Sequence, residues 1–201
     1  MRTLMLCSWP AALMLLTSLS LAQEGQPEGA LSPNHNGSVA VDPLGFALFG
    51  PTVNAEARVG SVGVGLGFRW LSPGVLANSL FLDEGDSFGF SYGLAARGHY
   101  YLTEPLSGPH IGFAVEYLKT RVENKSSQIA TVSSYVVPQI EAGYRFAWPR
   151  FFLGGVAALG YAAQVADDVE NINGGMSASL YEVEDESSVY GTARLDIGVF
   201  F

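Results

Sequence analysis

The segment 88–102 alternates between two kinds of residue over its whole length, and this pattern restricts the possible fold more than any other feature. One set is mostly apolar or aromatic: Phe88, Phe90, Tyr92, Leu94, Ala96, Gly98, Tyr100 and Leu102. The other set is small, polar or charged: Gly89, Ser91, Gly93, Ala95, Arg97, His99 and Tyr101. A period of two places the sets on opposite faces of a β-strand. Soluble strands usually have about 5–6 residues, whereas a membrane-spanning strand needs about 9–11, so the pattern favours a transmembrane strand.

The same alternation recurs along the chain. We expect eight strands, at residues 38–49, 52–59, 62–70, 86–102, 110–121, 132–147, 151–164 and 187–201. Pro43 interrupts the first, so residues 38–59 form either two strands or one bent strand. Short connections alternate with longer ones, and the longest, 165–186, is acidic. The sequence predicts an all-β fold, an eight-stranded antiparallel up-and-down transmembrane β-barrel.

The N-terminal region differs from this pattern. Residues 1–22 have an early Arg2, an apolar stretch and a small-residue cleavage site, which predicts a signal peptide. A buried N-terminal helix is the alternative. Residues 23–37 are polar and rich in Pro and Gly, so we expect a disordered tail with a solvated His35, followed by the barrel at 38–201. The single cysteine, Cys7, would be removed with the signal peptide.

Charge separates the two faces of the expected strands. The formal net charge of −9 argues against nucleic acid as a partner. The polar face combines arginines and acids in near balance and contains no lysine, and arginine is suited to buried ion pairs. We therefore expect a lumen network of Glu56, Arg58, Arg69, Arg97, His99, Glu116, Glu141, Arg145, Arg194 and Asp196. The alternative is the solvated outer face of a lipocalin-like barrel.

Aromatic residues lie near the expected strand ends. Trp70 and Tyr117 belong to one end, and Phe146, Trp148 and Phe201 belong to the other. Two interfacial girdles are typical of membrane barrels. Ordinary core packing also places aromatic residues in strands.

The last eight residues, 194–201, alternate and end in Phe201. This segment resembles the terminal strand of Gram-negative outer-membrane proteins, and the number of strands is similar to that of the small OmpA/OmpX-type barrels. The resemblance implies a place in the cell outer membrane, in contact with its lipid and lipopolysaccharide. It also implies recognition of Phe201 by the barrel assembly machinery during biogenesis, and a monomer.

Three functions remain open at this point. The first is a non-enzymatic barrel with a plugged lumen that serves membrane integrity or surface interaction through its loops, without cofactor or metal. The second is a lipid A-modifying enzyme, for which His99 and His110 are the available bases. The third is a small channel, with room left by inward glycines. The acidic loop has two interpretations: it is either an ordinary solvent-exposed loop or a site that binds calcium.

Overall fold

The computed structural model describes residues 35–46, 50–71, 86–88, 91–124, 129–171 and 188–201. The expected signal peptide, and the expected tail as far as residue 34, lie outside the described residues. The end of that tail differs from the expectation. His35 is half-buried: its Nε2 lies 2.8 Å from the carbonyl oxygen of Pro149, and its ring stacks on Phe200 with centroids 5.2 Å apart. Gly37 already belongs to the first strand.

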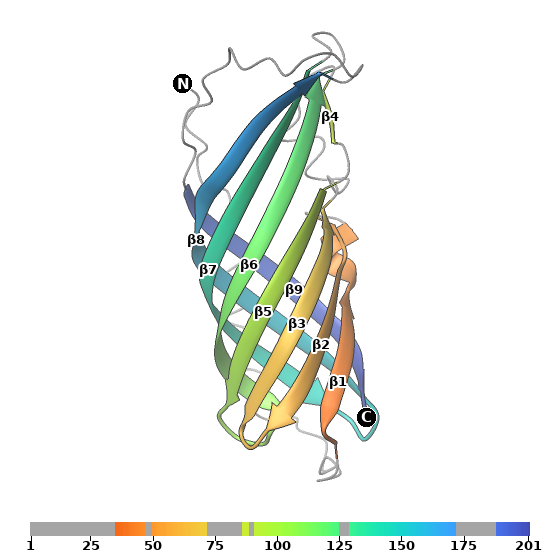
Figure 1. Cartoon of the computed structure of the whole chain (residues 1–201). Coiled ribbons are helices and arrows are strands. Elements are labelled where there is room, and N and C mark those ends of the chain that lie inside the picture. Colours follow the sequence, from red (N-terminus) through yellow and green to blue (C-terminus); the bar gives the residue numbers. More distant parts are fainter. Residues whose placement is uncertain (1–34, 47–49, 72–85, 89–90, 125–128, 172–187) are drawn as a thin grey trace.

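The described residues form one antiparallel sheet that closes on itself (Figure 1). Its strands are β1 (Gly37–Asp42), β2 (Thr52–Val59), β3 (Val62–Leu71), β4 (Asp86–Phe88), β5 (Ser91–Tyr101), β6 (Gly108–Asn124), β7 (Ile129–Ala147), β8 (Phe151–Asn171) and β9 (Ser188–Phe200). Both β4 and β5 pair with β6, so together they occupy one place in the wall. The ring therefore has eight antiparallel up-and-down strands, as predicted, and β1 pairs with β9 to close it.

The first expected strand ends earlier than the sequence suggested. β1 stops at Asp42, and a 3-10 helix, η2 (Pro43–Phe46), follows it. Asp42 accepts a hydrogen bond from the backbone N–H of Leu44, 3.0 Å away, which fixes the start of this helix. Residues 38–59 thus contain two strands, and the connection between them is 43–51 rather than a tight turn at Gly50 and Pro51.

The expected strand 86–102 corresponds to β4 and β5, and residues 89–90 between them lie outside the described residues. Phe88 pairs with Val122, whereas Tyr92 pairs with Lys119, so the register against β6 shifts by one residue between them. Such a shift leaves a backbone donor of the neighbouring strand without its regular partner. Here the Ser91 side chain accepts the hydrogen bond of the Arg121 backbone N–H at 2.8 Å.

Strands β6, β7 and β8 are longer than predicted and extend the wall on one side of the barrel (Figure 1). They meet the connections 125–128 and 172–187 at that end. The segments 122–124, 129–131 and 165–171, which were expected to be loops, belong to these strands. We call this the long-loop end. The opposite short-turn end has the connections 60–61, 102–107 and 148–150 and the C-terminus.

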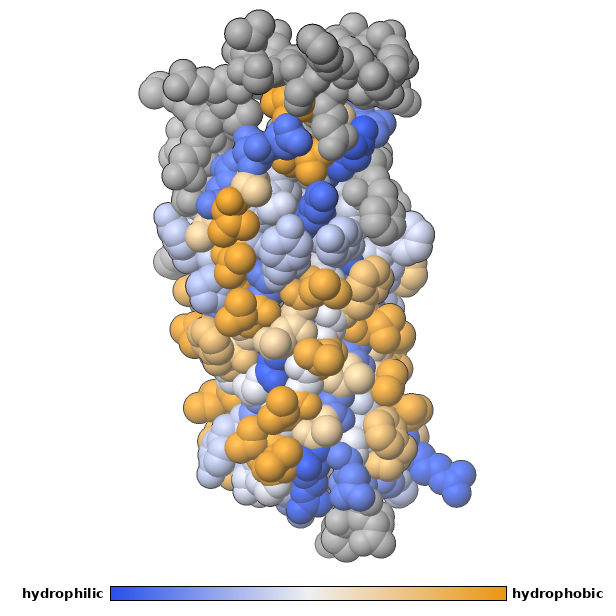
Figure 2. Space-filling view, viewed as in Figure 1, coloured by the Kyte–Doolittle hydropathy of each residue, from blue (hydrophilic) through white to orange (hydrophobic). Residues whose placement is uncertain are grey.

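The outer wall is apolar over much of its height (Figure 2). Outward side chains such as Leu66, Ile140 and Phe113 are exposed, whereas their polar neighbours in sequence point inward. Among the described residues, no helix is long and apolar enough to cross a membrane. Charged and polar side chains thus lie inside the ring, and apolar side chains form its outer surface.

Closure of the ring makes a direct prediction. Val39 of β1 and Val199 of β9 are Cα partners on the outer face. The double variant Val39→Cys/Val199→Cys should form a disulfide on mild oxidation, because opposed side chains across antiparallel strands lie about 4.5–5.5 Å apart at Cβ. Non-reducing gel migration of the folded chain measures it. The pair Val39→Cys/Val115→Cys joins β1 to a strand that does not pair with it and should not cross-link. Equal cross-linking of both pairs, or of neither, would contradict closure by β1 and β9.

Candidate functional site: the charged interior of the barrel

Nine of the ten predicted lumen residues are buried. Alternation turns them inward from β2, β3, β5, β6, β7 and β9, and because successive strands carry small residues at intermediate positions, the long side chains can meet across the barrel. The buried residues are Glu56, Arg69, Arg97, His99, Glu116, Glu141, Arg145, Arg194 and Asp196. Arg58 is different: it lies half-buried at the β2–β3 turn, where its Nε donates to the carbonyl of Gly60 at 3.2 Å.

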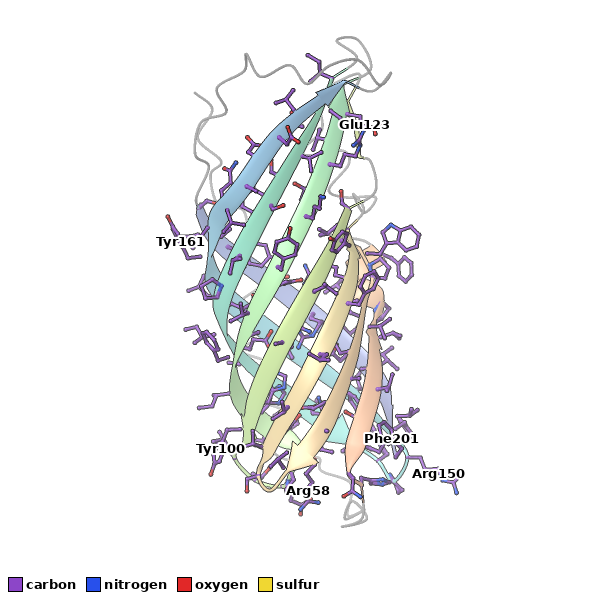
Figure 3. All side chains as sticks on the ribbon, viewed as in Figure 1. Arg58, Tyr100, Glu123, Arg150, Tyr161 and Phe201 are labelled. Carbon is purple, nitrogen blue, oxygen red and sulfur yellow. The ribbon has the colours of Figure 1, made fainter. Side chains whose placement is uncertain are left out.

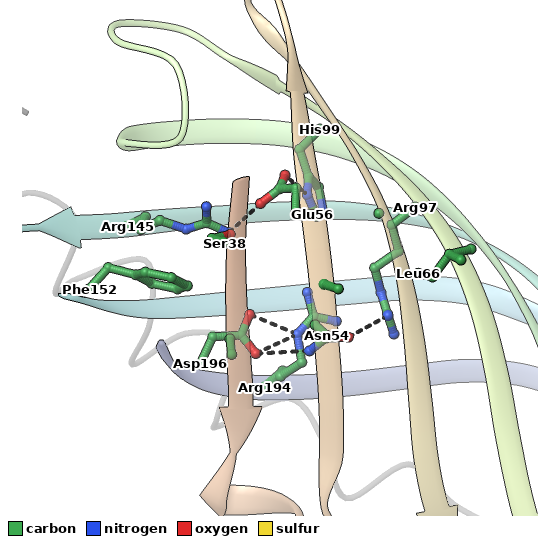
Figure 4. A pocket seen from close by; sticks show the side chains of 13 residues that line it. Ser38, Asn54, Glu56, Leu66, Arg97, His99, Arg145, Phe152, Arg194 and Asp196 are labelled. Carbon is green, nitrogen blue, oxygen red and sulfur yellow. Dashed lines mark hydrogen bonds and ion pairs between the residues drawn. The ribbon is translucent and has the colours of Figure 1, made fainter. Parts of the chain in front are cut away.

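Glu56 is the first centre of the network (Figure 4). Its carboxylate accepts from Arg145 Nη2 at 2.8 Å and from the Tyr101 hydroxyl at 2.9 Å, and it lies 3.0 Å from His99 Nδ1. β2 and β7 lie on opposite sides of the ring, so the bond between Glu56 and Arg145 spans the lumen. The Arg145 guanidinium also packs over the ring of Phe152, 4.3 Å from its centroid.

Glu141 is the second centre. Its Oε1 lies 3.4 Å from Arg97 Nε and 3.3 Å from Arg194 Nη1, and its Oε2 lies 2.6 Å from His99 Nε2. Both ring nitrogens of His99 therefore face glutamate oxygens. An ionised carboxylate only accepts hydrogen bonds, so this geometry fits an imidazolium that donates from both nitrogens. His99 links the two centres.

A third group extends the network to β9. Arg194 Nε lies 3.0 Å from an oxygen of Asp196. Asn54 bridges this pair to Arg97: its amide donates to Asp196 at 3.2 Å, and its oxygen accepts from Arg97 Nη1 at 2.6 Å (Figure 4). Arg97 and Asp196 are thus connected through the neutral side chain of Asn54 as well as through their ion pairs.

A separate pair lies between β3 and β6. Arg69 Nε is 3.2 Å from Glu116 Oε1, and Arg69 Nη1 donates to the hydroxyl of Tyr190 at 3.0 Å. Glu116 is only 1% exposed. Tyr190 is on β9, so Arg69, like Arg145, reaches across the lumen.

The charges of the interior balance. Its buried acids in the described part of the chain are Asp42, Glu56, Glu116, Glu141 and Asp196. With His99 as a cation, Arg69, Arg97, Arg145 and Arg194 complete an equal number of positive groups. Removing one partner of a buried pair typically costs about 3–5 kcal/mol, because the remaining charge is left uncompensated. Loss of any one ion-paired member therefore leaves at least one buried charge without its partner.

Apolar side chains close the lumen on both sides of the charges. Towards the short-turn end, Tyr101, Leu106, Phe152 and Phe200 pack together with Ala40. Leu106 reaches this cluster because the connection 102–107 folds inward with a φ of 63° at this residue. Its carbonyl lies 3.5 Å from Arg145 Nη1. Towards the long-loop end, a second cluster contains Leu71, Leu118, Val137 and Ala162.

Inward glycines make room for the large side chains. A Cβ added at Gly63 would overlap the carboxylate of Glu56, and one at Gly67 would overlap the guanidinium of Arg97. Gly112 and Gly198 lie in the same way against His99 and Phe152. The space beside these four glycines is therefore occupied by charged and aromatic groups.

A cavity of about 20 Å³ remains among the charges and is lined by Asn54, Glu56, Arg97, Arg194 and other network residues (Figure 4). A single water needs about 10–15 Å³ on this measure, so the cavity has room for about one water molecule. The Gln139 side chain is 2% exposed and has no hydrogen-bond partner among the described residues. A bound water is the simplest hydrogen-bond partner for the buried side-chain amide of Gln139.

Sequence reasoning missed Asn54, Tyr101 and Tyr190 as members of the network. All three have the alternation of the inward face, which was the available signal, but only charged residues were selected from that face. The role of Leu106 had no such signal, because it belongs to a turn.

The two histidines considered as bases lie inside the lumen near the short-turn end. Their ring centroids are 5.1 Å apart. His110 has its Nδ1 3.3 Å from the Gly108 carbonyl oxygen, and His99 is engaged by both glutamates. Of the acids in the expected loop 165–186, Asp167, Asp168 and Glu170 belong to β8, and Glu182, Glu184, Asp185 and Glu186 lie outside the described residues. No group of three or more candidate metal ligands occurs in the part of the chain that the structure describes.

Comparison with protein-family models, curated proteins and solved structures finds no match. The functional argument therefore depends on the geometry of this chain.

The packing of the network can be tested with two glycines. Gly67→Ala should destabilise the fold by about 1–3 kcal/mol, the usual cost of overpacking, because the added methyl displaces Arg97 and Asn54. Gly98→Ala is the matched control on the opposite face, where a Cβ meets nothing within 4 Å. Denaturant unfolding followed by tryptophan fluorescence measures both. Equal stabilities would mean that the lumen is not packed around Arg97.

Proposed function

We propose that the chain is a non-enzymatic outer-membrane β-barrel of the small OmpA/OmpX type. In this proposal a plugged polar lumen makes it a rigid body, and its loops contribute to membrane integrity or surface interaction. The observation that supports the proposal best is the inverted distribution of polarity. Leu66 is 70% exposed and Ile140 65% exposed, whereas the lumen charges are buried.

An apolar outer wall is costly in water. The exposed side chains on it come from all the long strands, and they include Leu66, Phe68, Leu94, Ile111, Phe113, Ile140, Leu153, Leu159, Ile197 and Val199. Soluble monomers rarely have apolar patches larger than a few hundred Å². In hydrocarbon the same surface is favourable, and a closed sheet leaves no backbone edge unpaired.

The height of the apolar wall is compatible with a bilayer. Along β8, Phe151 and Tyr161 are ten residues apart, which is about 33 Å of strand and about 25 Å of height at a tilt of about 40°. Tyr161 lies far above Tyr100 and Phe201 in Figure 3. All three are at least half exposed, as interfacial girdle residues are.

The two ends suggest an orientation. Bacterial outer-membrane barrels have short periplasmic turns and longer external loops. The short-turn end, with the C-terminus, then faces the periplasm, and the extended ends of β6, β7 and β8 lie on the external side of the membrane. A signal peptide in residues 1–22 would deliver the chain, and Phe201, which is 67% exposed, would present the terminal strand to the assembly machinery.

The interior argues against the two alternatives. A channel needs continuous space, but charged or aromatic side chains fill the space beside Gly63, Gly67, Gly112 and Gly198, and apolar clusters lie on both sides of the charges. An enzyme for lipid A needs its catalytic groups in the outer leaflet, whereas His99 and His110 are buried near the other end.

The membrane proposal predicts a dependence on depth. Leu66→Lys, near the middle of the wall, should destabilise the barrel folded in lipid vesicles by roughly 2–4 kcal/mol, and Val59→Lys, at the β2–β3 turn, by roughly 0–1 kcal/mol. Urea titration of folding into vesicles gives both values. Both residues are more than 60% exposed, so a water-soluble barrel would tolerate the two lysines equally.

The plugged lumen predicts electrical silence. The purified chain should produce no stable porin-sized steps in planar bilayers, because charged and apolar side chains fill the ring. A general porin reconstituted in parallel shows that insertion is detectable, and protease protection in the same lipid shows that this chain has inserted. Stable large steps from the inserted chain would overturn the plugged lumen.

A further inference from the structure

The cations outside the lumen are distributed unevenly. In the described part of the chain, Arg58 and Arg150 lie at the short-turn end, as Figure 3 shows. Lys119 and Arg121 lie on β6 towards the long-loop end. The neighbouring described acids include Glu123, Asp167 and Asp168. A basic pair within an acidic end is a local feature, not part of a generally basic surface.

Alternation places the pair on the lipid-facing side of β6. Phe113, Val115 and Tyr117 precede it at every second position, and the first two are clearly exposed. Lys119 and Arg121 follow Tyr117 by about 7 Å and 13 Å along the strand, or about 5 Å and 10 Å of height after tilt. They therefore come directly after the apolar wall, at the depth of lipid headgroups in the proposed orientation.

The platform around the pair is fixed. Tyr92 is the Cα partner of Lys119, and its ring centroid is 6.4 Å from that of Tyr117. The Tyr117 hydroxyl donates to Ser134 Oγ at 3.1 Å. The backbone of Arg121 is held by Ser91 at the register shift. Two aromatic rings thus lie beside the cations.

Glu123 neutralises the basic pair only in part. It lies 2.8 Å from Arg121 Nε, and both side chains are half-buried, at 26% exposed. One carboxylate faces two cations, so the pair keeps a net positive charge with respect to Glu123. Among the described residues, no ion pair involves Lys119.

We propose that Lys119 and Arg121, flanked by Tyr92 and Tyr117, bind a phosphate group of a phosphorylated glycolipid of the outer leaflet, namely lipopolysaccharide. The inference rests on the proposed function, because it needs the long-loop end to face that leaflet. A lysine ammonium acts as a point charge for phosphate, and the arginine fork adds directional donors. Aromatic rings at an interface offer an apolar face for the sugar and the first methylenes.

The experiment compares two double variants that remove the same charge. Lys119→Gln/Arg121→Gln removes the proposed site, and Arg58→Gln/Arg150→Gln removes two cations from the other end. Native mass spectrometry of the detergent-solubilised chain measures binding of lipopolysaccharide, phosphatase-treated lipopolysaccharide, phosphatidylglycerol and inorganic phosphate. Loss of two surface cations should weaken binding of intact lipopolysaccharide roughly tenfold to thirtyfold, and the other double variant should bind like the unchanged chain.

Each outcome decides the matter. Selective weakening with intact lipopolysaccharide, absent after phosphatase treatment, supports the site. Equal binding by both double variants, or equal use of phosphatidylglycerol or inorganic phosphate, overturns it. If the first double variant does not fold by circular dichroism, Lys119→Gln against Arg58→Gln gives the same comparison. A chain that stays monodisperse without detergent would refute the membrane proposal itself, whereas a detergent-requiring barrel without selective binding would refute only this inference.

Discussion

The fold depends on keeping nine buried charges of opposite sign paired where water has almost no access. An ion buried alone costs several kcal/mol, and hydrogen-bonded partners repay this only when the geometry is good. The lumen meets this requirement by sharing: Glu141 serves Arg97, His99 and Arg194, while Glu56 serves Arg145, His99 and Tyr101. These partners come from four strands, β2, β5, β7 and β9, so the network also fixes the relative positions of these strands.

Small residues in the wall are the structural condition for this sharing. Eight strands leave an interior that side chains just fill, and arginines can cross it only if neighbouring positions have no side chain. Gly63 and Gly67 give that room to Glu56 and Arg97. These two inward glycines are thus explained by the volume of the charged groups, and not by an open passage.

Period two determined most of what the sequence could predict. The number of strands, the face on which each residue lies and the burial of nine of the ten predicted network residues follow from it, because alternation in a strand is a local property. The pairing scheme could not be derived: whether Glu141 meets Arg97 or Arg69 depends on register and shear, which are set by the whole ring. The sequence did not predict where β6, β7 and β8 end, for a related reason. Residues 129–131 and 165–171 lack clear alternation, and they are strands because the neighbouring strands pair with them. Arg58 has the correct alternation but lies too near the turn to reach the lumen.

Phe200 and Phe201 together contribute to the packing below the charges, to the apolar outer wall and to the closure of the ring. Phe200 faces inward and packs on Phe152 in the apolar cluster below the charges, with ring centroids 5.0 Å apart. Phe201 faces outward, and its carbonyl oxygen accepts from the backbone N–H groups of Asn36 and Gly37 at 2.9 and 3.1 Å. These two consecutive residues therefore help to exclude water from the network, extend the apolar wall and close the ring to β1. Because burial of the charges requires all three, the end of the last strand is as much a part of the lumen as the arginines are.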